Sequence, residues 1–236
     1  MRLLLVLSAI VAIVAVPATA HAEGLIHRLP EDGTWARFEI TGTATEPDGA
    51  VQVTVQGTQT IRSVGQLDVE GEPCRWIELE MDANFNRTGS EPEKLFEYLK
   101  LLIPEKRLKQ GENPREHVLK AYKGPTAAGA QALAPNTASL DEFFHAPLEE
   151  TAAMPAETIK TNDREWTCEG TLGQSTTNNT RFVTRTRVHP EAPFGVVTYS
   201  YEKHRFRGDQ SQGMRTMAWK LVASGTGAKS IAPDKN

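Results

Sequence analysis

Two alternating segments near the carboxyl end of the chain constrain its fold more than any other feature. They occupy residues 181–207, RFVTRTRVHPEAPFGVVTYSYEKHRFR, and the connector HPEAPFG joins them. In the second segment Val197, Tyr199 and Tyr201 alternate with polar residues. A period of two places alternate side chains on opposite faces of a strand, which is typical of a sheet with one buried face. The chain is therefore expected to fold around an antiparallel sheet.

The same alternation recurs through most of the chain. Strands are predicted at residues 34–43, 50–71 (a long curved pair), 74–82, 163–173, 180–188, 195–207 and 213–224. The turn signal Pro47-Asp48-Gly49 separates the first two, and Gly57 and Gly65 are expected to mark bulges or bends. These patterns predict a curved sheet or half-barrel of seven to eight strands.

Between the two β-rich blocks, residues 90–160 show a different pattern. Ser90 and Glu93 form a capping box, and Leu95, Leu99 and Leu102 recur at helical spacing. Two further short helices are predicted, at residues 115–123 and from residue 139 onward, with a low-complexity loop at 124–138 between them. The fold class predicted is α+β, mostly antiparallel β, with a short helical insertion that covers one face of the sheet.

The first 22 residues are typical of a secretory signal peptide. Arg2 precedes the apolar run LLLVLSAIVAIVAV, and Ala20-His21-Ala22 provides a cleavage site of the A-x-A type. The run is short for a membrane span, and no charged stop-transfer segment follows it. We expect cleavage after Ala22, export to the periplasm or the medium as a soluble protein, one domain over residues 23–224, and a disordered tail over 225–236.

Charge is distributed unevenly along the chain. Residues 23–100 contain fifteen acidic and seven basic residues, whereas residues 181–220 contain eight basic and three acidic ones. The basic segment would suit an anionic partner such as a lipid headgroup, or it pairs with the acidic half within the fold. The net charge of −4, together with export, argues against nucleic acid as a partner.

Two cysteines in an exported chain favour a disulfide between Cys74 and Cys168. Trp76 and Trp166 each lie two residues from a cysteine in mirrored order, so an antiparallel register would pair both the cysteines and the tryptophans. Two free buried thiols are the alternative. Neither cysteine lies in the C-x-x-C spacing of a redox site, so a bond here would be structural.

Catalytic and cofactor motifs are absent from the sequence. The chain has no G-x-S-x-G elbow, H-E-x-x-H motif, P-loop, EF-hand loop or dinucleotide fingerprint. The histidines lack the spacing of metal ligands. Glu78, Glu80 and Asp82 share one strand face and either hold a calcium ion or form a solvated acidic face. We predict no enzyme activity, no cofactor and no metal site.

Apolar residues from several predicted strands and the first predicted helix could line one concave face. These candidate ligand-binding residues are Phe38, Ile40, Ile77, Leu79, Met81, Leu95, Leu99, Val197, Tyr199, Tyr201, Met217 and Trp219. In a fully packed domain they form the core. In a half-open barrel the same residues line a slot for an acyl chain or another apolar ligand.

The order of signal peptide, antiparallel meander, short helices and further long strands resembles the periplasmic carrier fold of the outer-membrane lipoprotein-sorting proteins. Two stretches add to the resemblance: LFEYLKLLIPEKRL in the predicted helix, and HPEAPFGVVTYSYE, which is similar to a step in uncharacterised exported relatives of that fold. The carriers have no signature catalytic residues, so the resemblance implies a half-barrel and no site to transfer.

Three functions are compatible with these patterns. The first is an exported, non-enzymatic protein that binds a lipid or another apolar small molecule in a half-open β-barrel. The second is a structural or interaction module of the cell envelope, with a packed core and an envelope protein as its partner. The third is a hydrolase whose site follows no known motif.

Overall fold

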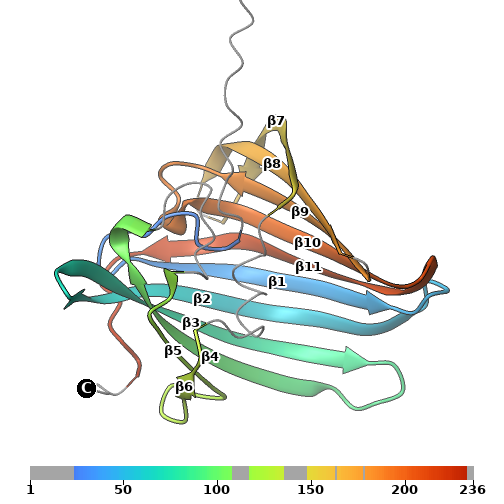
Figure 1. Cartoon of the computed structure of the whole chain (residues 1–236), viewed down its shortest axis with the longest axis horizontal. Coiled ribbons are helices and arrows are strands. Elements are labelled where there is room, and N and C mark those ends of the chain that lie inside the picture. Colours follow the sequence, from blue (N-terminus) through green and yellow to red (C-terminus); the bar gives the residue numbers. More distant parts are fainter. Residues whose placement is uncertain (1–23, 108–116, 136–147, 163, 178, 233–236) are drawn as a thin grey trace, which may run out of the picture.

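The protein is one open antiparallel sheet (Figure 1). The computed structural model describes residues 24–107, 117–135, 148–162, 164–177 and 179–232. The eleven strands lie in the order β6-β5-β4-β3-β2-β1-β11-β10-β9-β8-β7. Their bounds are β1 Trp35–Thr45, β2 Val51–Val69, β3 Glu72–Arg87, β4 Glu93–Pro104, β5 Lys120–Gly124, β6 Gln131–Leu133, β7 Glu150–Lys160, β8 Glu165–Thr177, β9 Thr180–Val188, β10 Val196–Arg207 and β11 Gln210–Gly225.

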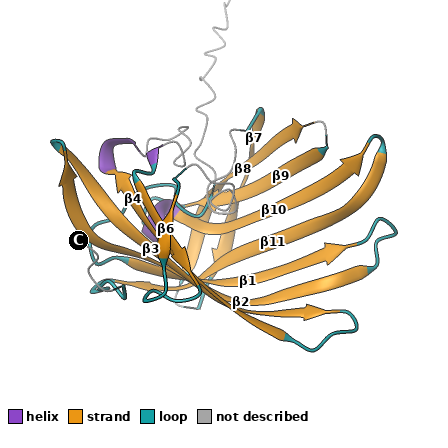
Figure 2. Ribbon diagram, turned by 60° about the horizontal axis from the view of Figure 1, so that its bottom comes forward, coloured by secondary structure: helices purple, strands orange, loops and turns teal. Residues whose placement is uncertain are grey.

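Two meanders meet at the centre of the sheet. Strands β1 to β6 run outward in chain order to one edge, and β7 to β11 run inward from the other edge. Strands β1 and β11 join the meanders, with Phe38 opposite Leu221 and Ile40 opposite Trp219. Strands β6 and β7 end the strand order and do not pair with each other within the described residues, so the sheet is not closed into a barrel. Figure 2 shows the sheet twisted and curved rather than flat.

The predicted α+β class is wrong. No α-helix occurs in the described part of the chain, which contains only short 3₁₀ turns such as η1 (Glu105–Arg107) and η4 (Pro193–Gly195). The sheet has eleven strands rather than seven or eight. Nor does any helix in the described ranges have the length and apolarity needed to cross a membrane. The predicted signal peptide lies outside those ranges.

The predicted helix after Ser90 is strand β4. Leu99, Leu101 and Ile103 point to one face of the strand and Tyr98 and Lys100 to the other, and all but Lys100 are buried. Because this strand is buried on both faces, its apolar residues also fit a spacing of three and four, which mimics a helix. The capping-box pattern instead precedes β4 at a turn, where no helix begins.

The second predicted helix, at residues 115–123, is wrong where it can be compared with the structure. Lys120–Gly124 forms β5, which pairs with β4 through Leu101 opposite Ala121 and Leu102 opposite Lys120. The third predicted helix, from residue 139, lies outside the described residues. The helical insertion over residues 90–160 is thus replaced by β4, β5, β6 and β7 in its described parts.

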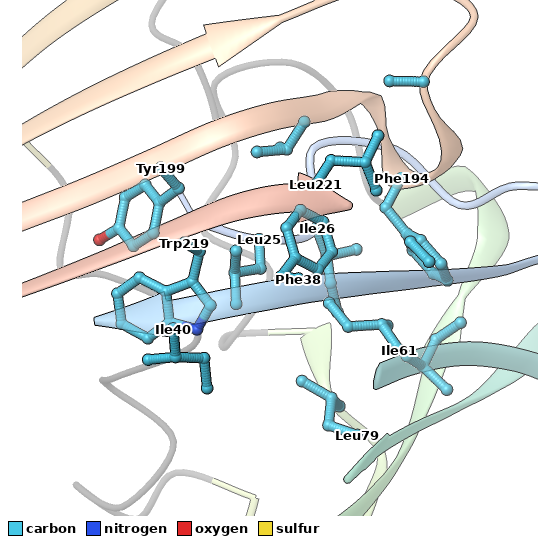
Figure 3. Close-up of a cluster of buried hydrophobic side chains, with 14 of the residues drawn as sticks. Leu25, Ile26, Phe38, Ile40, Ile61, Leu79, Phe194, Tyr199, Trp219 and Leu221 are labelled. Atoms are coloured by element: carbon cyan, nitrogen blue, oxygen red, sulfur yellow. The ribbon is translucent and has the colours of Figure 1, made fainter. Parts of the chain in front are cut away.

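The hydrophobic core lies against one face of the sheet, which we call the inner face. It carries Phe38 and Ile40 from β1, Ile61 from β2, Tyr199 from β10 and Trp219 from β11, all at most 4% exposed (Figure 3). The opposite face, called the outer face, carries the residues that alternate with these. The inner face is therefore one continuous apolar surface shared by both meanders.

The predicted pairing of Cys74 with Cys168 is wrong. Cys74 lies on β3, which pairs with β2 and β4, and Cys168 lies on β8, which pairs with β7 and β9. Five strands separate β3 from β8 in the sheet. Both thiols are free and buried. The mirrored Cys-x-Trp patterns belong to different meanders, so their symmetry does not reflect a cross-strand pair.

The segment after β11 turns back onto the sheet. The amide of Ala228 donates to the carbonyl of Gly33 at 2.8 Å, and the amide of Ile231 donates to Glu78 Oε2 at 3.0 Å. The sequence predicts a disordered tail over residues 225–236. Residues 226–232 of it are described and hydrogen-bonded at these points, whereas residues 233–236 lie outside the described ranges.

Candidate functional site

Most of the predicted ligand-binding residues meet on the inner face. Ten of the twelve belong to a single buried cluster, and Met81 packs against it half-buried. Leu95, near the start of β4, is half-buried and outside this cluster. The structure thus brings the predicted set together as a packed surface, and its role in ligand binding remains a prediction.

Aromatic rings occupy the middle of the inner face on the β9–β11 side. The ring centroids of Tyr199 and Trp219 are 5.3 Å apart, those of Tyr201 and Trp219 are 5.8 Å apart, and Phe182 stacks on Tyr201 at 5.1 Å. We call these four residues the inner aromatic group. Such offset and tilted contacts stabilise the group beyond the burial of its area. Together the rings form a broad, rigid apolar platform.

Buried polar side chains interrupt this apolar surface beside the inner aromatic group. Gln59 on β2 is fully buried, and its Oε1 accepts a hydrogen bond from Trp219 Nε1 at 2.7 Å. Among the described residues its other polar atom, Nε2, has no hydrogen-bond partner, and neither has the hydroxyl of Thr186 on β9, which is 3% exposed. Thr186 lies directly opposite Tyr199. The inner aromatic group therefore has an unpartnered amide on one side and an unpartnered hydroxyl on the other.

Gln59, Thr186 and Phe182 are not among the residues predicted from the sequence. A signal for Gln59 was present, because it falls in phase with Val55 and Ile61 on the buried face of β2. A polar residue in the buried phase of a strand indicates either a structural hydrogen bond or a binding group. Phe182 and Thr186 are likewise in phase with one another on β9.

A short N-terminal arm, residues 24–29, covers part of the inner face. Leu25 and Ile26 are at most 1% exposed and pack among Phe38, Ile40 and Trp219 (Figure 3). The next residues attach to the β9–β10 connector, where the amides at positions 27 and 28 both donate to the carbonyl of Phe194, at 2.9 and 3.2 Å. The arm and this connector close one end of the apolar surface.

Phe194 anchors the connector in the core. Its side chain is fully buried, and its backbone adopts φ 57°, which is uncommon for a residue with a Cβ. Gly195 follows at φ 80°, and a Cβ there would lie 3.1 Å from the side chain of His27. The stiff segment HPEAPFG therefore serves to insert one ring into the core and to hold the N-terminal arm.

The acidic residues of β3 are each paired with a cation. The nitrogen–oxygen distances are 3.3 Å for Lys100 with Glu78, 2.7 Å for Arg62 with Glu80, and 3.4 Å for Lys94 with Asp82. No cluster of three His, Cys, Asp or Glu side chains suited to a metal ion occurs within the described residues. These carboxylates therefore neutralise neighbouring basic side chains on the outer face.

Several basic residues near the carboxyl end are paired in the same way. Arg185 binds Glu202 with a nitrogen–oxygen distance of 2.5 Å, and Arg187 binds Glu157 at 2.8 Å. Glu39 of β1 lies opposite Lys220 of β11. Pairing within the fold thus accounts for part of the basic character that the sequence shows in this region.

No protein-family model matches the chain, and no curated protein matches it either. Among solved structures it is similar to a beta-barrel-like protein of a domain of unknown function, DUF1849, from Brucella abortus. The TM-score is 0.32 at 8% identity, covering 84% of this chain and 98% of that one. It is also similar to a candidate lipoprotein from Parabacteroides distasonis, with TM-score 0.31, 7% identity, and coverage of 86% and 99%.

A third similar structure is a candidate exported protein with a YmcC-like fold from Bacteroides fragilis. Its TM-score is 0.29 at 8% identity, and the match covers 88% of this chain and all of that one. None of the three is named as a lipoprotein carrier. Similarities this distant indicate neither a ligand nor an activity.

Proposed function

We propose that this protein is an exported, non-enzymatic binding protein that takes a lipid or another apolar ligand on the inner face of its open sheet. The observation that supports this most is the pair of unpartnered polar atoms, Gln59 Nε2 and Thr186 Oγ1, buried beside the inner aromatic group. An apolar core needs neither atom.

Both unpartnered atoms lower the stability of the folded protein. A buried polar group without a partner destabilises a fold by about 1–3 kcal/mol. Valine in place of Thr186 would avoid that cost, whereas an apolar residue in place of Gln59 would leave Trp219 Nε1 without its acceptor. A ligand whose oxygens accept hydrogen bonds from the Gln59 amide and the Thr186 hydroxyl would remove the cost at both positions, while its apolar body packs on the inner aromatic group. The proposed ligand is therefore amphipathic, with an apolar chain or ring system and an ester, amide or carboxyl oxygen.

In this proposal the ligand reaches the inner face by displacing the N-terminal arm. Leu25 and Ile26 fill space over β1 and β11, and the arm is held on the β9–β10 connector by two backbone hydrogen bonds to Phe194 and one from the Arg28 guanidinium to the carbonyl of Ala192. A ligand with a long chain would displace the arm and occupy its place against Phe38 and Trp219.

A second candidate function, a structural or interaction module of the envelope, is favoured by a different observation. Ten of the twelve predicted ligand-binding residues are at most 4% exposed, as in a fully packed core. In that case Gln59 serves only to hold Trp219, and the partner is a protein bound at another surface.

The experiment is native mass spectrometry of protein recovered from the envelope of its own host under mild conditions. We expect a bound mass of lipid size, released by organic solvent. Thr186→Val should lower the bound fraction several-fold without lowering stability, since it removes the unpartnered hydroxyl and leaves the hydrogen bond from Trp219 to Gln59 in place. Phe96→Leu, which changes an exposed aromatic residue on the outer face, is the matched control. Absence of any bound mass would overturn the proposal, and recovery of one stoichiometric protein instead would support the interaction module.

A further inference from the structure

A separate cavity lies on the outer face, at the opposite side of the sheet from the inner aromatic group. It has a volume of about 460 Å³ and is bounded by β2, β3, β4, β5, the β5–β6 turn and the C-terminal segment. Small-molecule sites commonly measure a few hundred to a thousand Å³. The residues that matter for its chemistry are Trp76, Tyr98, Lys100, Lys120, Tyr122 and Ser230.

Aromatic rings form one wall of this cavity. The ring centroids of Trp76 on β3 and Tyr122 on β5 are 6.1 Å apart, with their planes inclined at 47°. Lys100 Nζ lies 5.1 Å from the centre of the Trp76 ring, within the range of a cation–π contact. Both rings are only half-buried, so they present apolar faces to the cavity rather than to a core.

Tyr98 adds a buried hydrogen-bonding group. Its side chain is 2% exposed and lines the cavity, and its hydroxyl faces the carboxylate of Glu78 without a hydrogen bond of normal geometry to it. Burial and then the charge of Glu78 raise the pKa of Tyr98 far above its usual value, so the hydroxyl keeps its proton at any physiological pH. A protonated phenol is a hydrogen-bond donor that can serve an oxygen of a ligand.

The charges around the cavity leave one lysine unmatched. Lys100 is neutralised by Glu78, which is fully buried and also accepts hydrogen bonds from Ser230 Oγ and the Ile231 amide. Lys120 is exposed at the rim and has no carboxylate partner among the described residues. The described residues of the cavity therefore carry a net charge of about +1.

From these features we infer that the outer-face cavity binds a compact anion that carries a ring, with the ring against Trp76 and Tyr122 and the anionic group beside Lys120. The Tyr98 hydroxyl donates to an oxygen of the bound molecule. Both an aromatic acid and a sugar acid have this chemistry, since each combines a ring with an apolar face and a carboxylate.

The C-terminal segment completes the site. Ser230 and Ala232 line the cavity, and Ser230 contacts Glu78 and Lys100 at its base, with Lys100 Nζ donating to Ser230 Oγ at 3.2 Å. Part of the segment predicted from the sequence to be a disordered tail thus forms part of the cavity wall. This role gives a reason for the chain to bury Glu78 there.

The test is calorimetric titration of the full-length mature protein with benzoate and with glucuronate, using benzyl alcohol and glucose as their uncharged counterparts. We expect one anion to bind saturably and its neutral counterpart to bind about tenfold more weakly, the effect of one charged contact. Binding of benzoate identifies an aromatic acid as the ligand class, and binding of glucuronate identifies a sugar acid.

Two variants and a control connect the binding to this cavity. Lys120→Ala, at an exposed position, should weaken the anion about tenfold, and Tyr122→Leu should weaken both the anion and its neutral counterpart. Lys123→Ala removes a lysine from the other face of the same strand and should leave binding unchanged. The inference is overturned if neither anion binds saturably at millimolar concentration, or if Lys120→Ala and Tyr122→Leu both leave the affinity as it was.

Discussion

Glu78 is the side chain with the most demanding environment on the outer face. Its carboxylate is fully buried and is held by Lys100, which is 13% exposed, together with Ser230 and the Ile231 amide. A buried charge of this kind persists only because each of its oxygens has a donor. The sequence shows Glu78 as one member of an acidic strand face and gives no sign that it differs from Glu80 or Asp82.

Replacing Lys100 with methionine tests that difference. Lys100→Met keeps the apolar stem but leaves Glu78 without its counter-ion, so we expect a loss of about 3 kcal/mol in the free energy of unfolding. Lys94→Met breaks an ion pair whose partners are about half exposed, with Asp82, and should lose less than about 1 kcal/mol. Urea denaturation measures both variants. Equal losses would mean that Glu78 is solvated in the native protein.

The two cysteines allow a second test at the scale of single residues. Burial raises the pKa of Cys168 to about 11, and burial with the neighbouring Glu72 raises that of Cys74. Only the thiolate reacts with alkylating reagents, so a raised pKa and a buried sulfur both slow the reaction. We expect no labelling by iodoacetamide in the native protein near pH 8.

After unfolding in denaturant without reductant, both thiols should be labelled, and intact-mass spectrometry will count the added groups. A chain that takes no label until reductant is added would instead contain a disulfide, in conflict with the separation of β3 and β8 in the sheet. An exported chain meets oxidising conditions, so this experiment is best done on protein recovered after export.

At the scale of elements, the N-terminal arm is as much a part of the core as any strand. Leu25→Ala removes a fully buried side chain and should lower the free energy of unfolding by about 3 kcal/mol, as in other buried leucines. Leu67→Ala on β2, where the side chain is 39% exposed, is the matched control and should lose less than about 1 kcal/mol. Thermal or urea unfolding gives both values. A small effect of Leu25→Ala would show that the arm is detached from the sheet in solution.

The elements that sequence patterns predict best are those with one solvated face. In β10 and β11 the alternation of buried and half-buried residues is clear, and Val197, Tyr199, Met217 and Trp219 all lie on the predicted face. Strand β4 was mistaken for a helix because Leu99, Leu101 and Ile103 are buried on one face while Tyr98 and Leu102 are buried on the other. Period-two analysis fails where both faces are covered.

The outer-face cavity could not be predicted from the sequence, because its prediction depends on identifying β4 as a strand. Trp76 and Tyr122 come from β3 and β5, which lie on either side of β4 in the sheet. With β4 taken as a helix, no register exists that could bring the two rings together. The contribution of Ser230 depends on a long-range contact with Glu78, 152 residues earlier in the chain, for which local patterns provide no signal.

At the scale of the whole molecule, both meanders depend on the seam between β1 and β11. Gly42 of β1 faces Met217 across this seam. A Cβ at position 42 would contact Met217 Sδ and would lie 2.7 Å from the carbonyl oxygen of Thr216, which is too close for an unshifted backbone. Gly42→Ala should therefore lower the free energy of unfolding by about 1–3 kcal/mol. Gly129→Ala, in the β5–β6 turn, meets nothing nearer than Thr126 Oγ1 at 3.2 Å and serves as the control.

Gly42→Ala also tests whether the two meanders unfold as one cooperative unit. The inner face is one apolar cluster that includes Leu79 and Leu99 from one meander and Tyr199 and Trp219 from the other. Because the seam and this cluster couple the meanders, the variant should weaken amide protection equally in β3 and in β10, which hydrogen exchange with mass spectrometry resolves peptide by peptide. If protection falls in β10 alone, the meanders are separate folding units. In that case the two meanders could separate from each other without global unfolding. A ligand could then reach the inner face between them, and its entry would not require displacement of the N-terminal arm.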